Sequence, residues 1–180
     1  MNTSIGSGRR GRTLTGAALV AALASAGLGL GAPPALADTV SVSYACTGPG
    51  APGDLQTLQV DVTAPASVPQ GGTAELTLTA TTQMTIPIDV PARAVTGELD
   101  LTLGGAASGT VTATGFTNEN AIPSGSGVTL TGGTASVKLD TAGTTTFAPG
   151  NAKVHVFGVT VDCAVSGTAP VAATTEVTAP

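Results

Sequence analysis

Apolar and polar residues alternate over most of the chain beyond residue 38, in short blocks bounded by glycine and proline. Alternation with a period of two predicts β-strands that bury one face and expose the other, as antiparallel sheets do. Pro87 places one block at a sheet edge or a bulge, because proline has no N–H for a central ladder. The blocks are residues 40–46, 58–63, 75–80, 84–90, 99–103, 108–116, 128–131, 134–139 and 152–164.

Pairs of adjacent glycines predict tight turns between some of these strands. Gly104-Gly105 precedes the block at 108–116, and Gly132-Gly133 precedes the block at 134–139. Two-residue glycine loops supply the positive φ angles of primed hairpin turns. We therefore expect a hairpin at each pair.

The last block changes parity in its middle. Val154 and Val156 share one parity, whereas Val161 and Cys163 share the other. A β-bulge adds one residue to a strand and would keep both halves facing inward. The sequence thus predicts one long strand with a bulge at Gly158.

These strands predict a single all-β domain over residues 38–165. No helical periodicity is sustained there, and the abundant Thr, Val, Gly and Pro disfavour helices. About nine short strands in one domain favour a two-sheet sandwich, with a closed barrel as the alternative. Residues 166–180 lack sustained alternation and are expected to form a flexible tail.

The first 37 residues have the three parts of a secretory signal peptide. Three arginines before residue 13 precede an apolar stretch at residues 14–30, and Ala35-Leu36-Ala37 matches the small-x-small cleavage pattern. Cleavage there would leave Asp38 as the first residue. An uncleaved membrane anchor is the alternative, because the stretch approaches the length of a spanning helix. The glycines at 27, 29 and 31 disfavour the anchor.

The charge of the predicted mature chain restricts its partners. It keeps three of the six basic residues and all 11 acidic ones, so its net charge is 3 − 11 = −8. Three scattered cations cannot neutralise a row of phosphates, which excludes nucleic acid as a partner. Anionic membrane surfaces are disfavoured for the same reason.

Both cysteines, Cys46 and Cys163, lie in the predicted mature chain, near opposite ends of the domain. An exported chain meets oxidising conditions, in which two such cysteines form a structural disulfide. A metal site needs further ligands, and the only histidine, His155, has no second ligand at a suitable spacing. We expect a disulfide, and neither a metal nor a cofactor.

No motif in the sequence indicates catalysis. His155 has no Gly-x-Ser-x-Gly serine to activate, and is expected on the solvent face of its strand. Glu98 and Asp100 share a strand face, with Asp89 a candidate neighbour, but aromatic residues for a sugar platform are scarce. The oxygen-rich Asn118-Glu119-Asn120 lacks the spacing of a calcium loop. We do not expect an enzyme.

Four short segments resemble an uncharacterised family of secreted actinobacterial immunoglobulin-like β-sandwich proteins. The resemblance covers roughly residues 38–165 and implies an antiparallel sandwich of about 7–9 strands in an extracellular protein. It carries over no activity. An antibody-type domain is not implied, because no Trp is present to pack on the disulfide. The segments are Tyr44-Ala45-Cys46, Ser67-Val68-Pro69-Gln70-Gly71-Gly72, Phe147-Ala148-Pro149-Gly150 and Val161-Asp162-Cys163.

The sequence therefore predicts a secreted, non-catalytic structural or binding module of the cell surface or extracellular space. Its partner would be an extracellular protein, a glycan or a small molecule, and the mature chain has no membrane span. The alternatives are a small-ligand carrier and an enzyme inhibitor, for which the loop Ile122-Pro123-Ser124 is the candidate contact.

The cleavage site predicts the mass of the secreted form. If signal peptidase cuts after Ala37, intact-mass analysis of the culture medium should give a chain that begins at Asp38. A membrane-bound form that retains residues 1–37 would contradict the prediction.

Overall fold

A computed structural model describes residues 36–82 and 84–180. Most of the predicted signal peptide, residues 1–35, lies outside the described residues. The described part is all-β, as predicted, and no helix in it is long and apolar enough to cross a membrane. Its ten strands are β1 (Leu36–Thr47), β2 (Gln56–Ala64), β3 (Ser67–Pro69), β4 (Gly72–Thr82), β5 (Val95–Gly105), β6 (Gly109–Thr117), β7 (Val128–Leu139), β8 (Gly143–Val156), β9 (Val159–Val165) and β10 (Ala173–Thr178).

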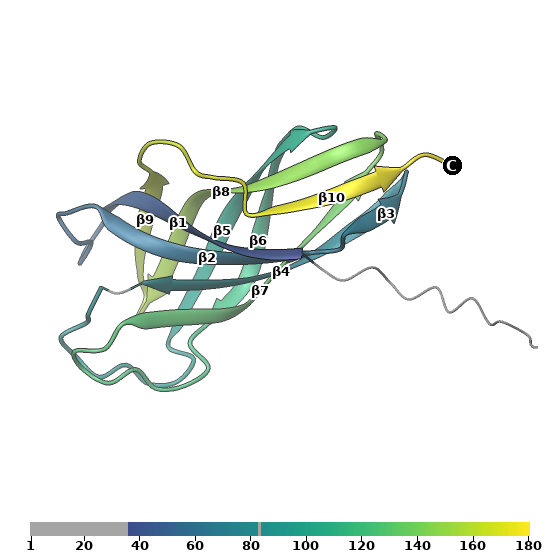
Figure 1. Cartoon of the computed structure of the whole chain (residues 1–180). Coiled ribbons are helices and arrows are strands. Elements are labelled where there is room, and N and C mark those ends of the chain that lie inside the picture. Colours follow the sequence, from purple (N-terminus) through teal and green to yellow (C-terminus); the bar gives the residue numbers. More distant parts are fainter. Residues whose placement is uncertain (1–35, 83) are drawn as a thin grey trace, which may run out of the picture. The chain divides into compact units, whose positions relative to one another are not determined.

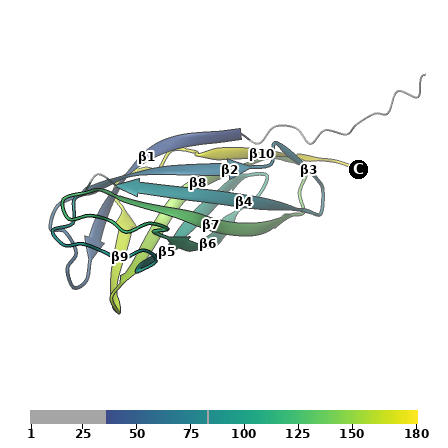
Figure 2. The same cartoon turned by 90° about the horizontal axis from the view of Figure 1, so that it is seen from below.

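The described strands form one hydrogen-bonded sheet that closes on itself. β9 pairs with β1 on one side and with the second half of β8 on the other. The closed circuit therefore runs β8-β5-β6-β7-β4-β2-β1-β9 and back to β8, and all its pairs are antiparallel. β1, β2, β4 and β7 lie side by side on one face of this ring, and β5, β6 and β9 lie on the other (Figures 1 and 2).

The arrangement is closer to a closed barrel, the alternative architecture considered from the sequence, than to two separate sheets. An immunoglobulin-like sandwich is not confirmed, because the ladder passes without a break from one face of the ring to the other. In a sandwich of two sheets, the outermost strands would each have an unpaired edge. In the closed ring these strands have a partner, which removes exposed hydrogen-bonding edges along much of the ring.

Alternation puts the apolar side chains inside the ring, as the sequence predicts. In β5, for example, Leu99, Leu101 and Leu103 are buried, whereas Glu98 and Thr102 are exposed. β2 and β4 follow the same rule with Val60, Val62, Ala74, Leu76 and Leu78. The interior between the two faces is thus one continuous apolar core.

The last predicted strand is two strands joined by a turn, so the predicted bulge at Gly158 is wrong. β8 ends at Val156, and Phe157-Gly158 forms a two-residue connection to β9 with φ angles of 49° and 80°. The change of parity arises because the chain reverses. Val154 pairs with Val161 across the hairpin, so both halves still face inward.

The hairpin predicted at Gly104-Gly105 is present, since β5 pairs antiparallel with β6, but its loop is longer than the predicted two residues. The hairpin predicted at Gly132-Gly133 does not form. Gly104 and Gly105 end β5, and the connection to β6 runs through residues 106–108. Gly132 and Gly133 lie inside β7, where the register against β4 shifts between Leu78 and Ala80. A side chain at position 133 would collide with the ring of the buried Phe116, so this glycine makes room for an aromatic side chain.

Residues 84–90 do not form the predicted strand. Only Val90 pairs, in an isolated bridge with Ile122. Proline at positions 87 and 91 removes N–H groups that a ladder would use.

The predicted flexible tail is wrong for residues 173–178, which form β10. This strand pairs antiparallel with the first half of β8 and parallel with β3. Ala173, Thr175 and Val177 alternate into the core, and the Thr175 hydroxyl donates to the Pro65 carbonyl at 2.8 Å. Because the middle inward residue is a threonine, the apolar alternation of this strand is weak in the sequence.

Tyr44 joins the two faces of the ring. Its side chain is buried, and its hydroxyl donates a 2.9 Å hydrogen bond to the carbonyl of Gly150 in β8. Burial raises the pKa of the Tyr44 phenol above its ordinary value of about 10, because the charged phenolate loses its hydration. The folded protein therefore holds Tyr44 neutral at pH values where the unfolded chain ionises it.

This difference predicts a loss of stability at alkaline pH. Stability is fully present below about pH 10 and falls by about 1.4 kcal/mol per pH unit above it, until the folded phenol also ionises. Tyr44→Phe should be less stable at neutral pH by about 1–3 kcal/mol, because the Gly150 carbonyl loses its donor. Denaturant unfolding at several pH values measures both effects.

The chain contains one Tyr and no Trp, so phenolate absorbance reports Tyr44 alone. It should appear together with unfolding. Ionisation near pH 10 in the folded protein would contradict the burial argument, as would an equal alkaline slope in Tyr44→Phe.

Candidate functional site

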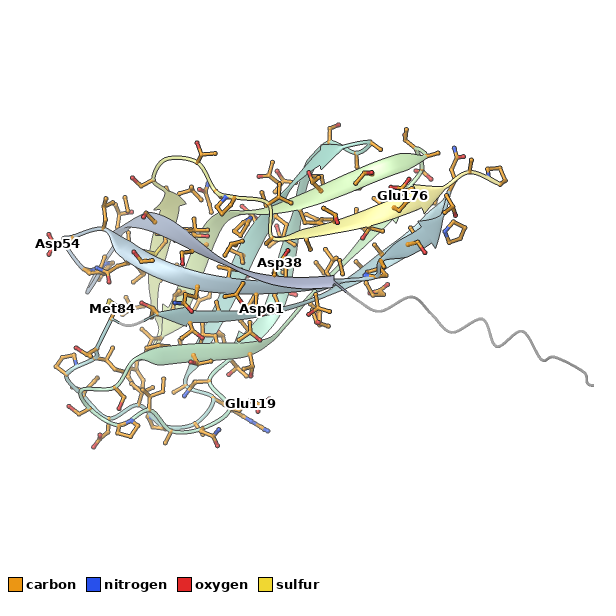
Figure 3. The ribbon with its side chains drawn as sticks, viewed as in Figure 1. Asp38, Asp54, Asp61, Met84, Glu119 and Glu176 are labelled. Carbon is orange, nitrogen blue, oxygen red and sulfur yellow. A yellow bond between two sulfur atoms is a disulfide. The ribbon has the colours of Figure 1, made fainter. Side chains whose placement is uncertain are left out.

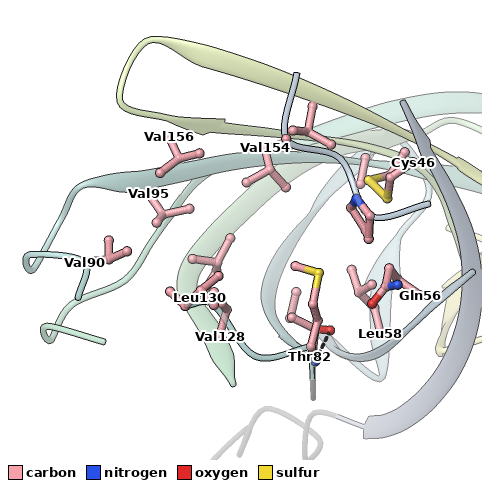
Figure 4. A pocket seen from close by; sticks show the side chains of 18 of the residues that line it. Cys46, Gln56, Leu58, Thr82, Val90, Val95, Val128, Leu130, Val154 and Val156 are labelled. Atoms are coloured by element: carbon pink, nitrogen blue, oxygen red, sulfur yellow. Dashed lines mark hydrogen bonds between the residues drawn. A yellow bond between two sulfur atoms is a disulfide. The ribbon is translucent and has the colours of Figure 1, made fainter. Parts of the chain in front are cut away.

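A cavity of about 300 Å³ lies inside the ring, at the end where β8 turns into β9. Figure 4 looks into it. Met84, beside this cavity, lies at the opposite end of the molecule from Glu176 of β10 (Figure 3). The lining residues are Cys46, Gly50, Pro52, Gln56, Leu58, Ala80, Thr81, Thr82, Met84, Ile86, Pro87, Ile88, Val90, Val95, Val128, Leu130, Ala152, Val154, Val156, Phe157, Val161 and Cys163.

Strands from both faces of the ring supply the walls. The β8–β9 hairpin contributes Val154, Val156 and Val161, since the turn places all three on the inner side. β2, β4 and β7 contribute Leu58, Ala80 and Leu130 from the other side. Elsewhere in the ring, the inward-facing side chains pack together in the core. At this end they are too short to meet, so they face an unfilled space.

The lining is almost entirely apolar. Gln56, Thr81 and Thr82 are its polar side chains, and none of the lining residues is charged. Gln56 donates to the Asp54 carbonyl at 3.0 Å, and the Thr82 hydroxyl accepts the Met84 N–H at 3.1 Å, the dashed line in Figure 4. These groups are therefore already used within the protein.

Residues 84–90 line one side of the cavity and are paired with a second loop segment, residues 118–126. Val90 and Ile122 exchange two backbone hydrogen bonds of 2.9 and 2.8 Å, and Gly125 donates to the Ile86 carbonyl at 2.7 Å. The carboxylate of Asp89 accepts the Ser124 N–H at 2.8 Å. Backbone pairing thus holds Ile86 and Val90 against the cavity although the segment is not a strand.

Asn118 fixes the base of these loops. Its side chain is buried, with its oxygen accepting the Val95 N–H at 2.8 Å and its nitrogen donating to the carbonyls of Pro91 and Asn120. The amide considered as a calcium ligand is therefore bonded to backbone groups, and Glu119 is exposed. No group of three or more metal-ligating side chains occurs within residues 36–82 and 84–180.

The predicted disulfide is confirmed. Cys46 of β1 and Cys163 of β9 are direct cross-strand partners and are bonded to each other. Both also line the cavity. The bond therefore fastens the closing strand of the ring at the place where the interior is hollow.

The titratable residues singled out in the sequence lie outside the cavity. His155 is half-buried on the opposite side of β8 from Val154 and Val156, with its Nδ1 2.9 Å from the Thr160 hydroxyl. Glu98 and Asp100 share a shallow surface hollow, as their common strand face predicts, and Asp100 accepts a hydrogen bond from Thr112. Asp89 is not among the residues that line this hollow.

The cavity itself was not predicted from the sequence. Its lining comes from residues far apart in the chain, and alternation shows which side chains face inward but not whether they fill the interior. One local signal exists: the small residues Ala80 and Ala152 occupy inward positions on facing walls, where a packed core would need larger side chains.

The position of the disulfide predicts its contribution to stability. It closes a loop of 117 residues, for which the chain-entropy model gives about 4–5 kcal/mol. Reduction, or replacement of both cysteines by alanine, should lower the melting temperature by many degrees. Calorimetry of the oxidised and reduced protein measures this shift, and two free thiols in the folded, unreduced protein would contradict the pairing.

Comparison with protein-family models, with curated proteins and with solved structures found no match to this chain. No activity or ligand is therefore transferred from another protein. The functional argument rests on the cavity and on the chemistry of its described lining.

Proposed function

We propose that this domain is a secreted, non-catalytic binding protein that carries one small, neutral, apolar molecule in the cavity beside the Cys46–Cys163 disulfide. The observation that carries the proposal is the cavity of about 300 Å³ with its apolar lining. Ligand pockets in proteins are mostly apolar concavities of this size or larger with a few polar groups. The carrier is thus favoured over a purely structural module.

The volume limits the size of the ligand. An engineered apolar cavity of about 150 Å³ holds one benzene ring. About twice that volume holds a two-ring molecule or a short branched alkyl chain.

The lining limits the charge of the ligand. Burying an unpaired ionised group costs many kcal/mol, and none of the lining side chains carries an opposite charge. A neutral hydrocarbon-like molecule incurs no such cost. Each buried methylene contributes about 0.8 kcal/mol, and association subtracts at least about 4 kcal/mol. A ligand of about ten such groups should then bind with a dissociation constant of about 1 mM at the tightest.

The other functional readings have less support in the geometry. Ile122 of the candidate inhibitory loop is buried, so the loop does not present this side chain to a protease. Secretion is supported by the signal-like sequence at residues 1–37 and by the disulfide, which persists in oxidising compartments.

Filling the cavity should abolish binding. The neutral two-ring dye 1-aminonaphthalene changes its fluorescence in apolar surroundings, and we expect the protein to bind it with a stoichiometry of one. Ala80 lines the cavity, so Ala80→Phe should occupy the space and weaken dye binding at least tenfold, with stability kept or raised. A fluorescence titration measures the affinity.

Ala45→Phe is the matched control, because it makes the same substitution at an exposed position of β1. It should leave dye binding unchanged. Equal affinity of Ala80→Phe and the parent protein would refute the cavity as the binding site.

A further inference from the structure

We infer that the mouth of the cavity docks on a neutral lipid surface through an apolar rim formed by Leu55, Ile88 and Phe157. The inference rests on the proposed function, since the lipid surface is the source from which the apolar ligand would enter. These three side chains are 60%, 54% and 59% exposed. Ile88 and Phe157 line the cavity, and Leu55 adjoins the lining residue Gln56.

The backbone conformation at Phe157 indicates that this side chain has a role other than stabilising the fold. Its φ of 49° lies in the left-handed region, where large side chains are strained and where Asn or Gly is preferred in a two-residue turn. The ring gains little from burial, since more than half of it is in water. Both the backbone conformation and the exposure are unfavourable for phenylalanine, and such strain concentrates at functional sites.

The size of the rim favours lipid over a protein partner. Three side chains of this kind expose roughly 300 Å² of apolar surface, whereas a stable protein interface buries about 800 Å² on each partner. A second copy of this chain would therefore be held too weakly by the rim. Attachment to a lipid surface needs only a few apolar side chains inserted to about 5–10 Å.

The charges favour a lipid surface without net charge. The cations of the described chain are Arg93, Lys138 and Lys153, and none of them belongs to the rim or to the cavity lining. Lys138 and Lys153 are also next to Asp140 and Asp162, at 2.8 and 4.0 Å. With a net charge of 3 − 11 = −8 over residues 38–180, the chain is repelled by anionic lipids.

Docking in this orientation would give the ligand a dry path. The rim borders the opening of an apolar cavity, so inserting the rim places the cavity against the acyl chains. An apolar molecule then moves from lipid to protein without crossing water, which otherwise opposes its transfer.

The test is co-sedimentation of the oxidised, cleaved protein with vesicles of phosphatidylcholine alone. We expect the parent protein to bind, and Phe157→Asn to bind at least tenfold more weakly, because each lost apolar group reduces insertion. Asn adopts the left-handed conformation readily, so the melting temperature of Phe157→Asn should stay equal or rise. The melting temperature therefore distinguishes a variant that binds vesicles weakly because it has unfolded from a folded variant that has lost the docking contact.

Val171→Asn is the matched control, because Val171 is 47% exposed and lies outside the cavity lining. It should bind vesicles like the parent. Ala80→Phe should also keep vesicle binding while losing the dye. Leu55→Asn changes a rim residue outside the cavity lining, so it should bind vesicles more weakly and keep the dye in solution. Failure of the docking and failure of the proposed function therefore give different results.

Three outcomes would overturn the inference. They are no binding of the parent to phosphatidylcholine, equal binding of Phe157→Asn, and binding that requires anionic lipid and disappears at high salt. A parent protein that is a dimer in solution, and that Phe157→Asn converts to a monomer, would show instead that the rim covers a second copy of the chain.

Discussion

The double pairing of β9 is the constraint on which the rest of the structure depends. This seven-residue strand must form ladders with both β1 and β8, and only then does the sheet become a closed ring. Closure commits every inward side chain to a shared interior, whether or not the side chains fill it. The disulfide at Cys163 covalently secures one of the two ladders, the one with β1.

The two ends of the interior differ because the chain has few large side chains. With one Tyr and three Phe, the core is built from Val, Leu, Ala and Ile. At the end near β10, Phe147 and Leu139 fill the space between the faces. At the other end the described walls carry Val, Leu and Ala, and the third phenylalanine, Phe157, is more than half exposed at the cavity rim and does not fill the interior. A hollow end follows directly from this distribution.

The sequence predicted the features that depend on neighbouring residues or on the compartment. Alternation identified most strands and their inward faces, and compartment logic identified the Cys46–Cys163 bond. Two glycines were misread. The parity change at Gly158 fits a bulge and a hairpin equally well. The role of Gly133 is set by a residue distant in the sequence, since Phe116 packs on it. The cavity depends on how far apart the two faces of the ring lie, a distance that alternation along single strands does not contain.

Closure by β9 also sets the order of events during synthesis. β1 is the first described strand to be made, yet its second neighbour follows after 117 further residues. At a synthesis rate of about 5–20 residues per second, one edge of β1 stays open for about 6–23 s. During that time the growing chain carries an unpaired edge that other chains can extend. The growing chain therefore needs protection at this edge until β9 has been made.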